Sequence, residues 1–482
     1  MLKEHRQFWI EHPVLSIGIS FAIGIGISIF SFSLWIFILW NSYCLVLKKW
    51  ASFTFVFFAW VYGSLLFKDY PMIENPLPCK AYFSIHSIQN HQTPFHKSLL
   101  YKGTLHLNQN RLPCAAIFSK NPPSPQLKDL YLEGVLTQQG RFSYQIKPKK
   151  WTYAPHSFTL APYRYLLKQS VKQFINSKFS KKTAPLLASL ITGELEDRLL
   201  RFEFSRVGLQ HLLAISGFHF GILIAFATSF FGLFLPCKWK WGALFISITL
   251  YYLFIGPSPS VQRTWITVSL FFLAKVLKRP ILPINLLGAA FFIELIFNPL
   301  IVENIGFQLS FASCLGILFL YQPLESIFQI YFPKRSFDQT SKFSLAEKIT
   351  YLFSNFFRSA LSLNIAISII LTPLLLYHFH KFPLLSLLFN LIFPLAIGVV
   401  MSLFLHSLLI YFLIPIAGNY LFKLVDLISS EFLQMTTYPP FILDYSIYKN
   451  EFNSIFIPFY YFFILFLKLK FFPNSRTTAH FL

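Results

Sequence analysis

Long apolar runs constrain the fold of this chain more than any other feature of its sequence. Each is about 17–25 residues long, enough for a helix to cross roughly 30 Å of hydrocarbon. Hydrophobic residues make up 55% of the chain and charged residues 12%, whereas a soluble domain is about a quarter charged. A membrane β-barrel would show short alternating segments instead. The sequence therefore predicts an α-helical polytopic membrane protein with about ten or eleven spans.

Changes in composition divide the chain into five parts. Basic residues in the N-terminus and between the second and third runs favour the inner side of the membrane, so the third span ends outside. The predicted parts are N-terminal spans at 1–67, an extracytoplasmic domain at 68–160, an amphipathic interfacial segment at 161–206, a transmembrane domain at 207–470 and a short tail at 471–482. Within the transmembrane domain, 383–414 fits one long or two short spans, and 415–452 could lie along the interface.

Residues 68–160 have the pattern of a small β-rich domain. Short alternating runs predict about five strands, with a hairpin over 131–147 around Gln139-Gly140. A small barrel fits this pattern, and an OB-fold is one candidate. Its basic residues far outnumber its acids, at Lys97, Lys102, Arg111, Lys120, Lys128, Lys147, Lys149 and Lys150. Basic charge interleaved with aromatic rings suits single-stranded nucleic acid, but a folded lid with solvated lysines explains it equally well.

The net charge of +22 points to anionic partners. Part of it is the positive-inside bias of membrane proteins, and membrane lipid headgroups explain a further part. Nucleic acid is the other class of partner that such an excess favours.

Two of the cysteines lie in the predicted external domain. Cys79 and Cys114 would be on the oxidising side of the membrane, where a disulfide can form. Their pairing is a hypothesis. The sequence has no CxxC or Cys/His ligand pattern, so we expect neither a metal site nor a cofactor.

The stretch GLQHLLAISGFHFGIL places polar residues at the mouth of an apolar run. His211 and His219 are eight residues apart and fall on roughly one side of a helix. Gly217 and Gly221 form a GxxxG pair that permits close helix contact, and Ser216-Gly217 can break the helix. Buried polar groups in lipid usually face a bundle interior or a wet cavity.

Three further stretches share this polar character. They are GPSPSVQR with Ser258 and Arg263, ENIGFQLSFASCLG with Gln308 and Ser310, and a later region with Pro373, Asn390 and Pro394, which predicts a kinked helix. Each alone has an ordinary explanation, because spans tolerate proline and serine and arginine can snorkel to headgroups. Several such stretches in one bundle, however, predict a shared polar pathway.

These motifs resemble the signature of the ComEC family of competence proteins, the inner-membrane channels for DNA uptake in bacteria. The family's Gly-acidic pair, Gly, His-Leu and Ala-x-Ser-Gly-x-His run are matched by Gly193-Glu194, Gly208, His211-Leu212, Ala214, Ser216-Gly217 and His219. Its Gly-x-Ser…Arg turn resembles Gly256, Ser258 and Arg263. Its Pro…Gly-Phe-Gln-Leu-Ser-Phe run resembles Pro299, Gly306, Phe307, Gln308, Leu309, Ser310 and Phe311, and its later segments resemble Pro373 and Asn390.

The resemblance implies transport of single-stranded DNA across the bacterial inner (plasma) membrane during natural transformation. The residues that would then line the pathway are Glu194, His211, Ser216, Gly217, His219, Ser258, Arg263, Gln308, Ser310 and Asn390. The sequence has no P-loop of the form GxxxxGK[ST]. A separate cytoplasmic ATPase or helicase would therefore supply energy, and a periplasmic receptor would deliver the DNA. The channel could also be a homo-oligomer.

Many members of the family continue into a metallo-β-lactamase-like domain. The His-x-His-x-Asp-His pattern does not occur in this sequence, so nuclease activity is not carried over and we expect a protein that is not an enzyme.

Two alternatives stay open. An intramembrane metal-dependent hydrolase could use His211, His219, Glu194, Glu203 and Ser216, although the sequence has no HExxH or GxSxG motif. A small-solute or lipid-linked transporter uses similar broken helices.

Overall fold

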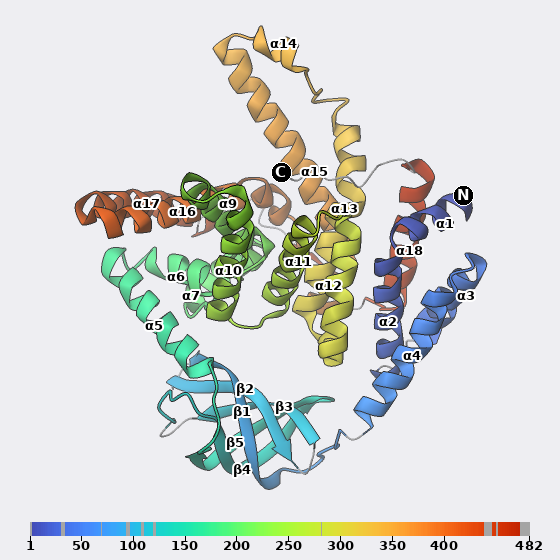
Figure 1. The fold of residues 1–482 in the computed structure, drawn as a ribbon, viewed down its shortest axis with the longest axis vertical. Coiled ribbons are helices and arrows are strands. Elements are labelled where there is room, and N and C mark those ends of the chain that lie inside the picture. The colour runs from blue at the N-terminus through green and yellow to red at the C-terminus, as the bar shows by residue number, and fades with distance from the viewer. Residues whose placement is uncertain are drawn as a thin grey trace.

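The computed structural model describes residues 2–29, 34–68, 70–92, 97–107, 110–118, 122–280, 282–437, 446–449 and 452–472. Most of the chain forms a helical body, and a closed β-barrel sits at one end of it (Figure 1). An arm projects from the opposite end (Figure 1). It consists of the end of α13 (Ile305–Phe328), α14 (Phe337–Ser341) and the start of α15 (Leu345–Phe379). The predicted tail lies almost wholly outside the described residues.

The barrel has the strand order β1-β2-β3-β5-β4 and is closed by the pairing of β4 with β1. Its strands are β1 (Leu77–Gln92), β2 (Lys97–Leu107), β3 (Asn110–Phe118), β4 (Leu130–Gly140) and β5 (Ser143–Tyr153). The pair β3–β5 is parallel and the other pairs are antiparallel. A closed five-stranded barrel with this order has the architecture of an OB-fold.

Period-two patterning explains why these segments form strands around one core. Alternate side chains such as Phe83, Leu112 and Ile146 are fully buried inside the barrel. The predicted hairpin is confirmed, because β4 and β5 pair antiparallel with Gly140 opposite Ser143.

The two barrel cysteines both occupy inward-facing positions. Cys79 is four residues before the inward residue Phe83, so it faces the same way in a strand. Cys114 lies between the inward residues Leu112 and Ala116. Both are free thiols in this structure. Their pairing stays a hypothesis.

Helices make up the rest of the described chain. Before the barrel come α1 (Leu2–Glu11), α2 (Pro13–Ile29), α3 (Leu34–Val46) and α4 (Trp50–Phe67). After it come α5 (Ala161–Lys178), α6 (Ala184–Thr192), α7 (Arg198–Arg206) and α8 (Gln210–Leu213). The following elements are α9 (Gly217–Phe234), α10 (Cys237–Ile255), α11 (Pro259–Val276), α12 (Pro283–Phe297) and the 3-10 helix η2 (Pro299–Glu303). Beyond α15 lie β6 (Lys381–Pro383), α16 (Leu385–Leu413), α17 (Pro415–Thr437), β7 (Ser446–Tyr448) and α18 (Phe456–Phe471).

Fewer helices are long enough to cross a membrane than the sequence predicts. Among the described residues five helices qualify by length and hydropathy, namely α4, α9, α13, α15 and α16. A sixth is possible if α1 and α2, which meet at 93°, form one broken span. The apolar stretches of α3, of α12 and of residues 239–255 in α10 are each shorter than 18 residues, and a helical stretch of that length rises less than about 27 Å. The predicted ten or eleven spans are therefore not confirmed.

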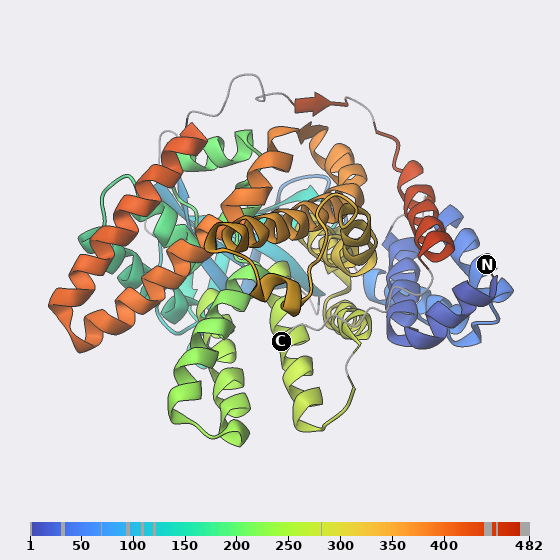
Figure 2. The same cartoon turned by 90° about the horizontal axis from the view of Figure 1, so that it is seen from above.

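Each of the two uncertain segments near the C-terminus contains one long helix, and the interfacial placement of 415–452 stays a prediction. Residues 383–414 contain the single helix α16, which runs through Pro394, just as α15 runs through Pro373. Helix α17 packs along α16 (Figure 2). Helix α18 lies beside the N-terminal helices, where Leu465 shares a core with Trp9 and Trp40 (Figures 1 and 2).

The barrel is attached to the helical body at two places. The tip of the β4–β5 hairpin inserts Phe142 into a core shared by α2, α4, α11, α12, η2 and α13, and Arg141 donates a hydrogen bond to Ile29 O. On the other side, α5 packs against β1, α6 and α10. This second contact positions the site described next.

Candidate functional site

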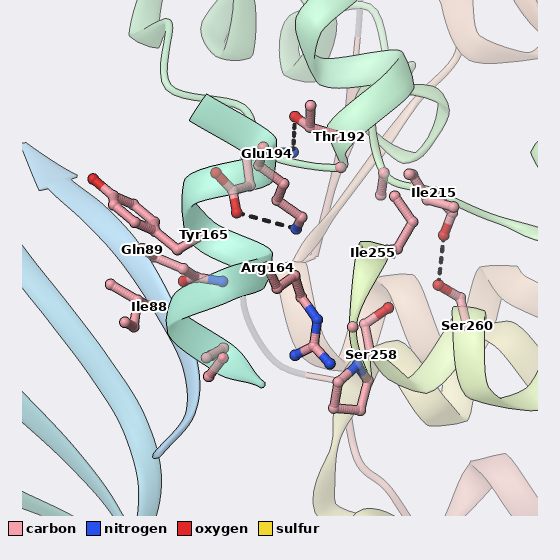
Figure 3. Close-up of a pocket in the computed structure, with 17 residues that line it drawn as sticks. Ile88, Gln89, Arg164, Tyr165, Thr192, Glu194, Ile215, Ile255, Ser258 and Ser260 are labelled. Carbon is pink, nitrogen blue, oxygen red and sulfur yellow. Dashed lines mark hydrogen bonds and ion pairs between the residues drawn. The ribbon is translucent and has the colours of Figure 1, made fainter. Parts of the chain in front are cut away.

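A cavity of about 240 Å³ lies where the barrel, α5 and the membrane helices meet (Figure 3). Its walls come from β1, α5, the segment after α6, the residues before α9 and the link between α10 and α11. The lining residues are Ser87, Ile88, Gln89, Ala161, Arg164, Tyr165, Lys168, Thr192, Gly193, Glu194, Ala214, Ile215, Ile255, Gly256, Pro257, Ser258 and Ser260. Two separate stretches of the predicted motif, Gly193-Glu194 and Gly256 to Ser258, therefore meet in one place.

Two glycines of the motif shape the wall of this cavity. Gly193 ends α6 in the left-handed region at φ 72°, and Gly256 follows α10 at φ 90°. Glycine adopts this conformation without the steric cost that a Cβ atom brings. A Cβ at Gly193 would lie 3.2 Å from Ile215, and one at Gly256 would lie 3.1 Å from the guanidinium carbon of Arg164. Both positions therefore require glycine for conformation and for space.

Two buried lysines of α5 hold the acidic residue of the motif. Lys168 Nζ lies 3.1 Å from Glu194 Oε1, and Lys172 Nζ lies 2.6 Å from Glu194 Oε2. Lys172 Nζ also contacts Glu196 Oε1 at 2.5 Å. Glu196 in turn accepts a hydrogen bond from Asn90 Nδ2 of β1 at 3.0 Å. This ion network joins the barrel, α5 and the segment after α6.

The surroundings shift the pKa values of Lys168 and Lys172 in opposite directions. Both residues lie outside the membrane-spanning helices. Desolvation lowers the pKa of Lys168, and attraction to Glu194 only partly offsets it, because Arg164 and Lys172 lie nearby. Desolvation also disfavours charge on Lys172, but two carboxylates, Glu194 and Glu196, outweigh it and raise the pKa of Lys172. Lys168 is therefore the less fully compensated cation of the pair.

Arg164 connects the barrel to the membrane helices at the cavity wall. Its Nε donates to Leu253 O of α10 at 2.7 Å, and its Nη1 donates to His86 O of β1 at 3.1 Å. Figure 3 shows the guanidinium beside Ser258. An arginine fixed in this way presents a permanent positive charge and oriented donors to the cavity.

The start of α11 adds a further positive feature. Ser258 is the N-cap of α11, and its side chain makes no capping hydrogen bond. The first N–H groups of a helix have no partner within it, and they carry a partial positive charge. The cavity thus places Arg164, Lys168 and a helix N-terminus around one carboxylate, Glu194, which favours an anionic ligand.

A line of polar side chains leads from the cavity into the helical body. Ser260 Oγ of α11 donates to Ile215 O at the cavity wall at 2.7 Å. Beyond it, Ser216 lies at the start of α9, where its Oγ is 3.2 Å from Nδ1 of His219. His219 is buried, and its Nε2 has no hydrogen-bond partner in the described chain. The break between α8 and α9 therefore places polar groups next to the cavity.

The line continues across α11 and α13. A Cβ at Gly217 would lie 3.7 Å from Nη2 of Arg263, so the two helices approach closely there. Arg263 Nε donates to Ser310 Oγ of α13 at 2.8 Å, and its Nη1 lies 2.8 Å from Sγ of Cys314. The guanidinium carbon also lies 5.8 Å from the ring centre of Phe311.

Gln308 is two residues before Ser310 on α13, so it lies on a different side of that helix, and it contacts α15. Its Oε1 lies 2.7 Å from Nε2 of His378, and its Nε2 donates to Val302 O at 2.8 Å. We call Ser216, Gly217, His219, Arg263, Gln308, Ser310, Cys314 and His378 the polar track. Its residues come from four helices, and described contacts join α9 to α11, α11 to α13, and α13 to α15.

The structure groups most of the predicted pathway residues but not all of them. Glu194 and Ser258 belong to the cavity, and the others belong to the polar track, except His211 and Asn390. His211 is exposed on the single turn α8. Asn390 lies on α16, and its Oδ1 is buried without a partner among the described residues. Neither joins the cavity or the track through a described contact.

The motif residues predicted to be structural have mixed outcomes. Gly217 makes the close helix contact expected of the GxxxG pair, but a Cβ at Gly221 would meet nothing within 4 Å, so that half of the expectation is wrong. Gly208 has φ 76° and packs against Ser386 of α16. Gly306 follows the N-cap Asn304 of α13, and Phe307 stacks on Phe291 with ring centres 5.3 Å apart.

Sequence reasoning missed the cations of α5 and one buried acid. Arg164, Lys168 and Lys172 are spaced four residues apart, which puts them on one helical face, and this spacing was the available signal. Glu294 of α12 is fully buried, and neither of its carboxylate oxygens has a partner in the described chain. A lone acid in an apolar run is itself a functional signal. Among the described residues, no group of His, Cys, Asp and Glu could hold a metal ion.

Comparisons with known proteins agree with the motif. A family model described as competence protein matches residues 193–472, which is more than half of the chain. ComE operon protein 3 of Bacillus subtilis (strain 168) is 26% identical over 324 residues, covering 64% of this chain and 36% of that protein. This chain therefore corresponds to little more than a third of that relative. No solved structure matches it. The chain belongs to the competence protein family.

Proposed function

We propose that this protein transports single-stranded DNA across the bacterial inner membrane during natural transformation. The observation that carries the proposal is the cationic cavity joined to a polar track through the helical body. A phosphate charge cannot cross hydrocarbon unaided, so a channel must replace its hydration with donors and positive potential. Arg164, Lys168, Ser216, Arg263 and Ser310 are such groups, and they lie in one connected region.

The barrel supports the same proposal from the outer side. Lys102, Arg111, Lys128, Lys147, Lys149 and Lys150 are all exposed on it. The side chains of Lys97 and Lys120 lie outside the described residues. An OB-fold with exposed cations and aromatic rings suits single strands, because phosphates and base stacking are recognised together. The barrel lies at the same end of the helical body as the cavity, so a strand collected there is close to the entrance.

The energy and delivery of DNA come from other proteins in this proposal. A separate cytoplasmic ATPase or helicase pulls the strand inward, and a periplasmic receptor delivers it to the barrel. Membrane lipids surround the helical body, and association of several copies is compatible with the same pathway.

The experiment that tests the proposal is uptake of labelled DNA in cells that carry single variants of the polar track. His219→Ala and Arg263→Ala should abolish transfer of label into the cytoplasm while the protein remains in the membrane at its normal level. His156→Ala and Arg335→Ala are matched controls, because both residues are exposed and neither lines the cavity or belongs to the polar track. Normal uptake with both track variants would reject the proposal.

A further inference from the structure

The cavity at the junction of the barrel and the membrane helices contains its own counter-ion. We infer that it is a binding site for one phosphodiester of the transported strand, in which Glu194 occupies the anion position until a phosphate displaces it. The inference rests on the proposed function and specifies how the strand is held at the entrance. It concerns the described residues Arg164, Lys168, Lys172, Glu194 and Glu196.

The first support is the arrangement of charge. Lys168 and Lys172 are 6% and 7% exposed, and both contact Glu194, one at each carboxylate oxygen. A buried lysine without a partner is strongly unfavourable, because desolvation is not repaid by an opposite charge. Glu194 therefore keeps these cations in place when the cavity contains no ligand. A phosphodiester also offers two anionic oxygens and can replace a carboxylate in the same geometry.

The second support is that the two lysines do not depend equally on Glu194. Lys172 keeps a second carboxylate, Glu196, at 2.5 Å, whereas Glu194 is the only carboxylate in the described chain that pairs with Lys168. If Glu194 swings away, Lys172 remains paired, and Lys168 needs a new anion. Lys168 and Arg164 both line the cavity, so an incoming phosphate meets these two cations first.

The third support is the size and polarity of the space. A volume of about 240 Å³ is many times the roughly 10–15 Å³ that one buried water requires in the same measure. One phosphate group with part of its sugar fits this volume. Ser87, Gln89 and Ser258 add hydrogen-bonding groups at the wall, and the start of α11 adds a positive helix end.

Exchange of Glu194 for phosphate would also affect how the barrel is held. Glu194, Lys172 and Glu196 connect α5 with Asn90 of β1, and Tyr165 donates to Asn90 Oδ1 at 3.0 Å. The Glu196 half of this network stays intact in the proposed exchange. The barrel therefore remains attached while the strand moves through the cavity, which suits a site that must bind weakly enough to release each phosphate.

The test measures binding of a short oligothymidylate to the full-length protein in nanodiscs of zwitterionic lipid, over a range of salt concentrations. Glu194→Gln removes the internal competitor, so affinity should rise severalfold and the salt dependence should steepen. Lys168→Gln removes a charge-assisted contact, so affinity should fall about tenfold and the slope of log K against log salt should drop by about 0.7. Lys348→Gln and Glu347→Gln are matched controls, because both residues are exposed near the start of α15, which lies in the arm at the end opposite the barrel and the cavity.

Three outcomes would overturn the inference. The first is equal affinity of the wild type and Glu194→Gln. The second is an affinity gain that persists when the oligonucleotide carries neutral methylphosphonate linkages. The third is loss of the Glu194→Gln gain when anionic lipid is added to the nanodisc, which would assign the cavity to a lipid headgroup. Misfolding cannot mimic tighter binding, so Glu194→Gln remains informative even if Lys168→Gln is unstable. Absence of oligonucleotide binding and uptake in the wild type would instead reject the proposed function.

Discussion

Arg263 of α11 and Ser310 of α13 are joined by a hydrogen bond of 2.8 Å from Nε to Oγ inside the helical body. Arg263 is only 9% exposed. Within the part of the chain that the structure describes, no carboxylate lies within ion-pair distance of its guanidinium. Its charge is therefore held by neutral partners, Ser310 and Cys314, and by the ring of Phe311. A buried arginine of this kind can accept an anion without first breaking an ion pair.

Replacing Arg263 with lysine and with glutamine should separate its charge from its geometry. Lysine keeps the charge but not the planar fork that reaches Ser310 and Cys314 together, so Arg263→Lys should retain part of the DNA uptake. Arg263→Gln should lose it. Both should lower the free energy of unfolding by about 1–3 kcal/mol, because buried partners lose a donor. Thermal unfolding in nanodiscs, alongside uptake, checks both statements. Equal uptake by the two variants would show that the charge does not matter.

We expect Glu294 to lower the stability of the folded protein and to be kept for a functional reason. It is fully buried on α12 without a hydrogen-bond partner in the described chain, and burial of an unpartnered polar group costs stability. Glu294→Met should therefore raise the free energy of unfolding by about 1–3 kcal/mol. A double-mutant cycle with Arg263→Gln measures whether the two side chains interact, since coupled residues deviate from additivity by about 0.5 kcal/mol or more. A destabilised Glu294→Met protein would contradict this account.

The sequence predicted the barrel strands and individual helices better than the number of membrane spans or the contacts between helices. The barrel strands follow from period-two patterning, and the predicted hairpin forms, although its turn is Arg141–Phe142, just after Gln139-Gly140. The span count did not follow, because apolar runs such as 283–297 form helices too short to qualify. Hydropathy records the length of a run but not how the helix is packed or where it ends.

The candidate site was only half visible in the sequence. The motif identified Glu194 and Arg263, but a motif does not state which side chains face them. Lys168 lies within 161–206, which the sequence predicts only as an amphipathic interfacial segment. Its place in the cavity depends on how α5 packs between β1 and α10. That packing is a tertiary contact, which the pattern of the segment itself does not encode. His211 matched the motif equally well, yet it belongs to neither the cavity nor the track.

Binding of an oligonucleotide should weaken at a lower alkaline pH than it would if Lys168 had the pKa of an exposed lysine. Desolvation lowers the pKa of Lys168 from the usual 10.5, so this cation loses its proton at a lower pH than an exposed lysine does. The positive charge is present below the lowered pKa and is lost as pH rises through it. Affinity measured from neutral pH to pH 10.5 should fall within that window in the wild type. The same titration of Lys168→Gln should lack this component.

Alanine at the two cavity glycines should be costly, and a third glycine provides the control. Gly193→Ala and Gly256→Ala force a Cβ into the left-handed region and against Ile215 or Arg164. Each should destabilise the protein by about 1–3 kcal/mol and reduce DNA uptake. Gly221→Ala meets open space within a helix, so it should be neutral or stabilising by up to about 1 kcal/mol. A loss of stability at Gly221 comparable to that at Gly193 would contradict the assignment.

The state of the barrel cysteines can be determined from the pH dependence of stability. Burial raises the pKa of the Cys114 thiol to about 12, from 9.0 in the unfolded chain. The folded state therefore disfavours the thiolate, and the stability that the neutral thiol contributes is present below pH 9.0 and declines as pH rises towards 12. Comparison with Cys114→Ala isolates this contribution from the buried tyrosines. Iodoacetamide should leave Cys114 unmodified in the folded protein and label it after unfolding, because only the thiolate reacts. If Cys79 and Cys114 form a disulfide, the pH-dependent difference from Cys114→Ala disappears, and iodoacetamide labels the unfolded protein only after a reductant is added. The experiment therefore decides between the thiol and disulfide forms.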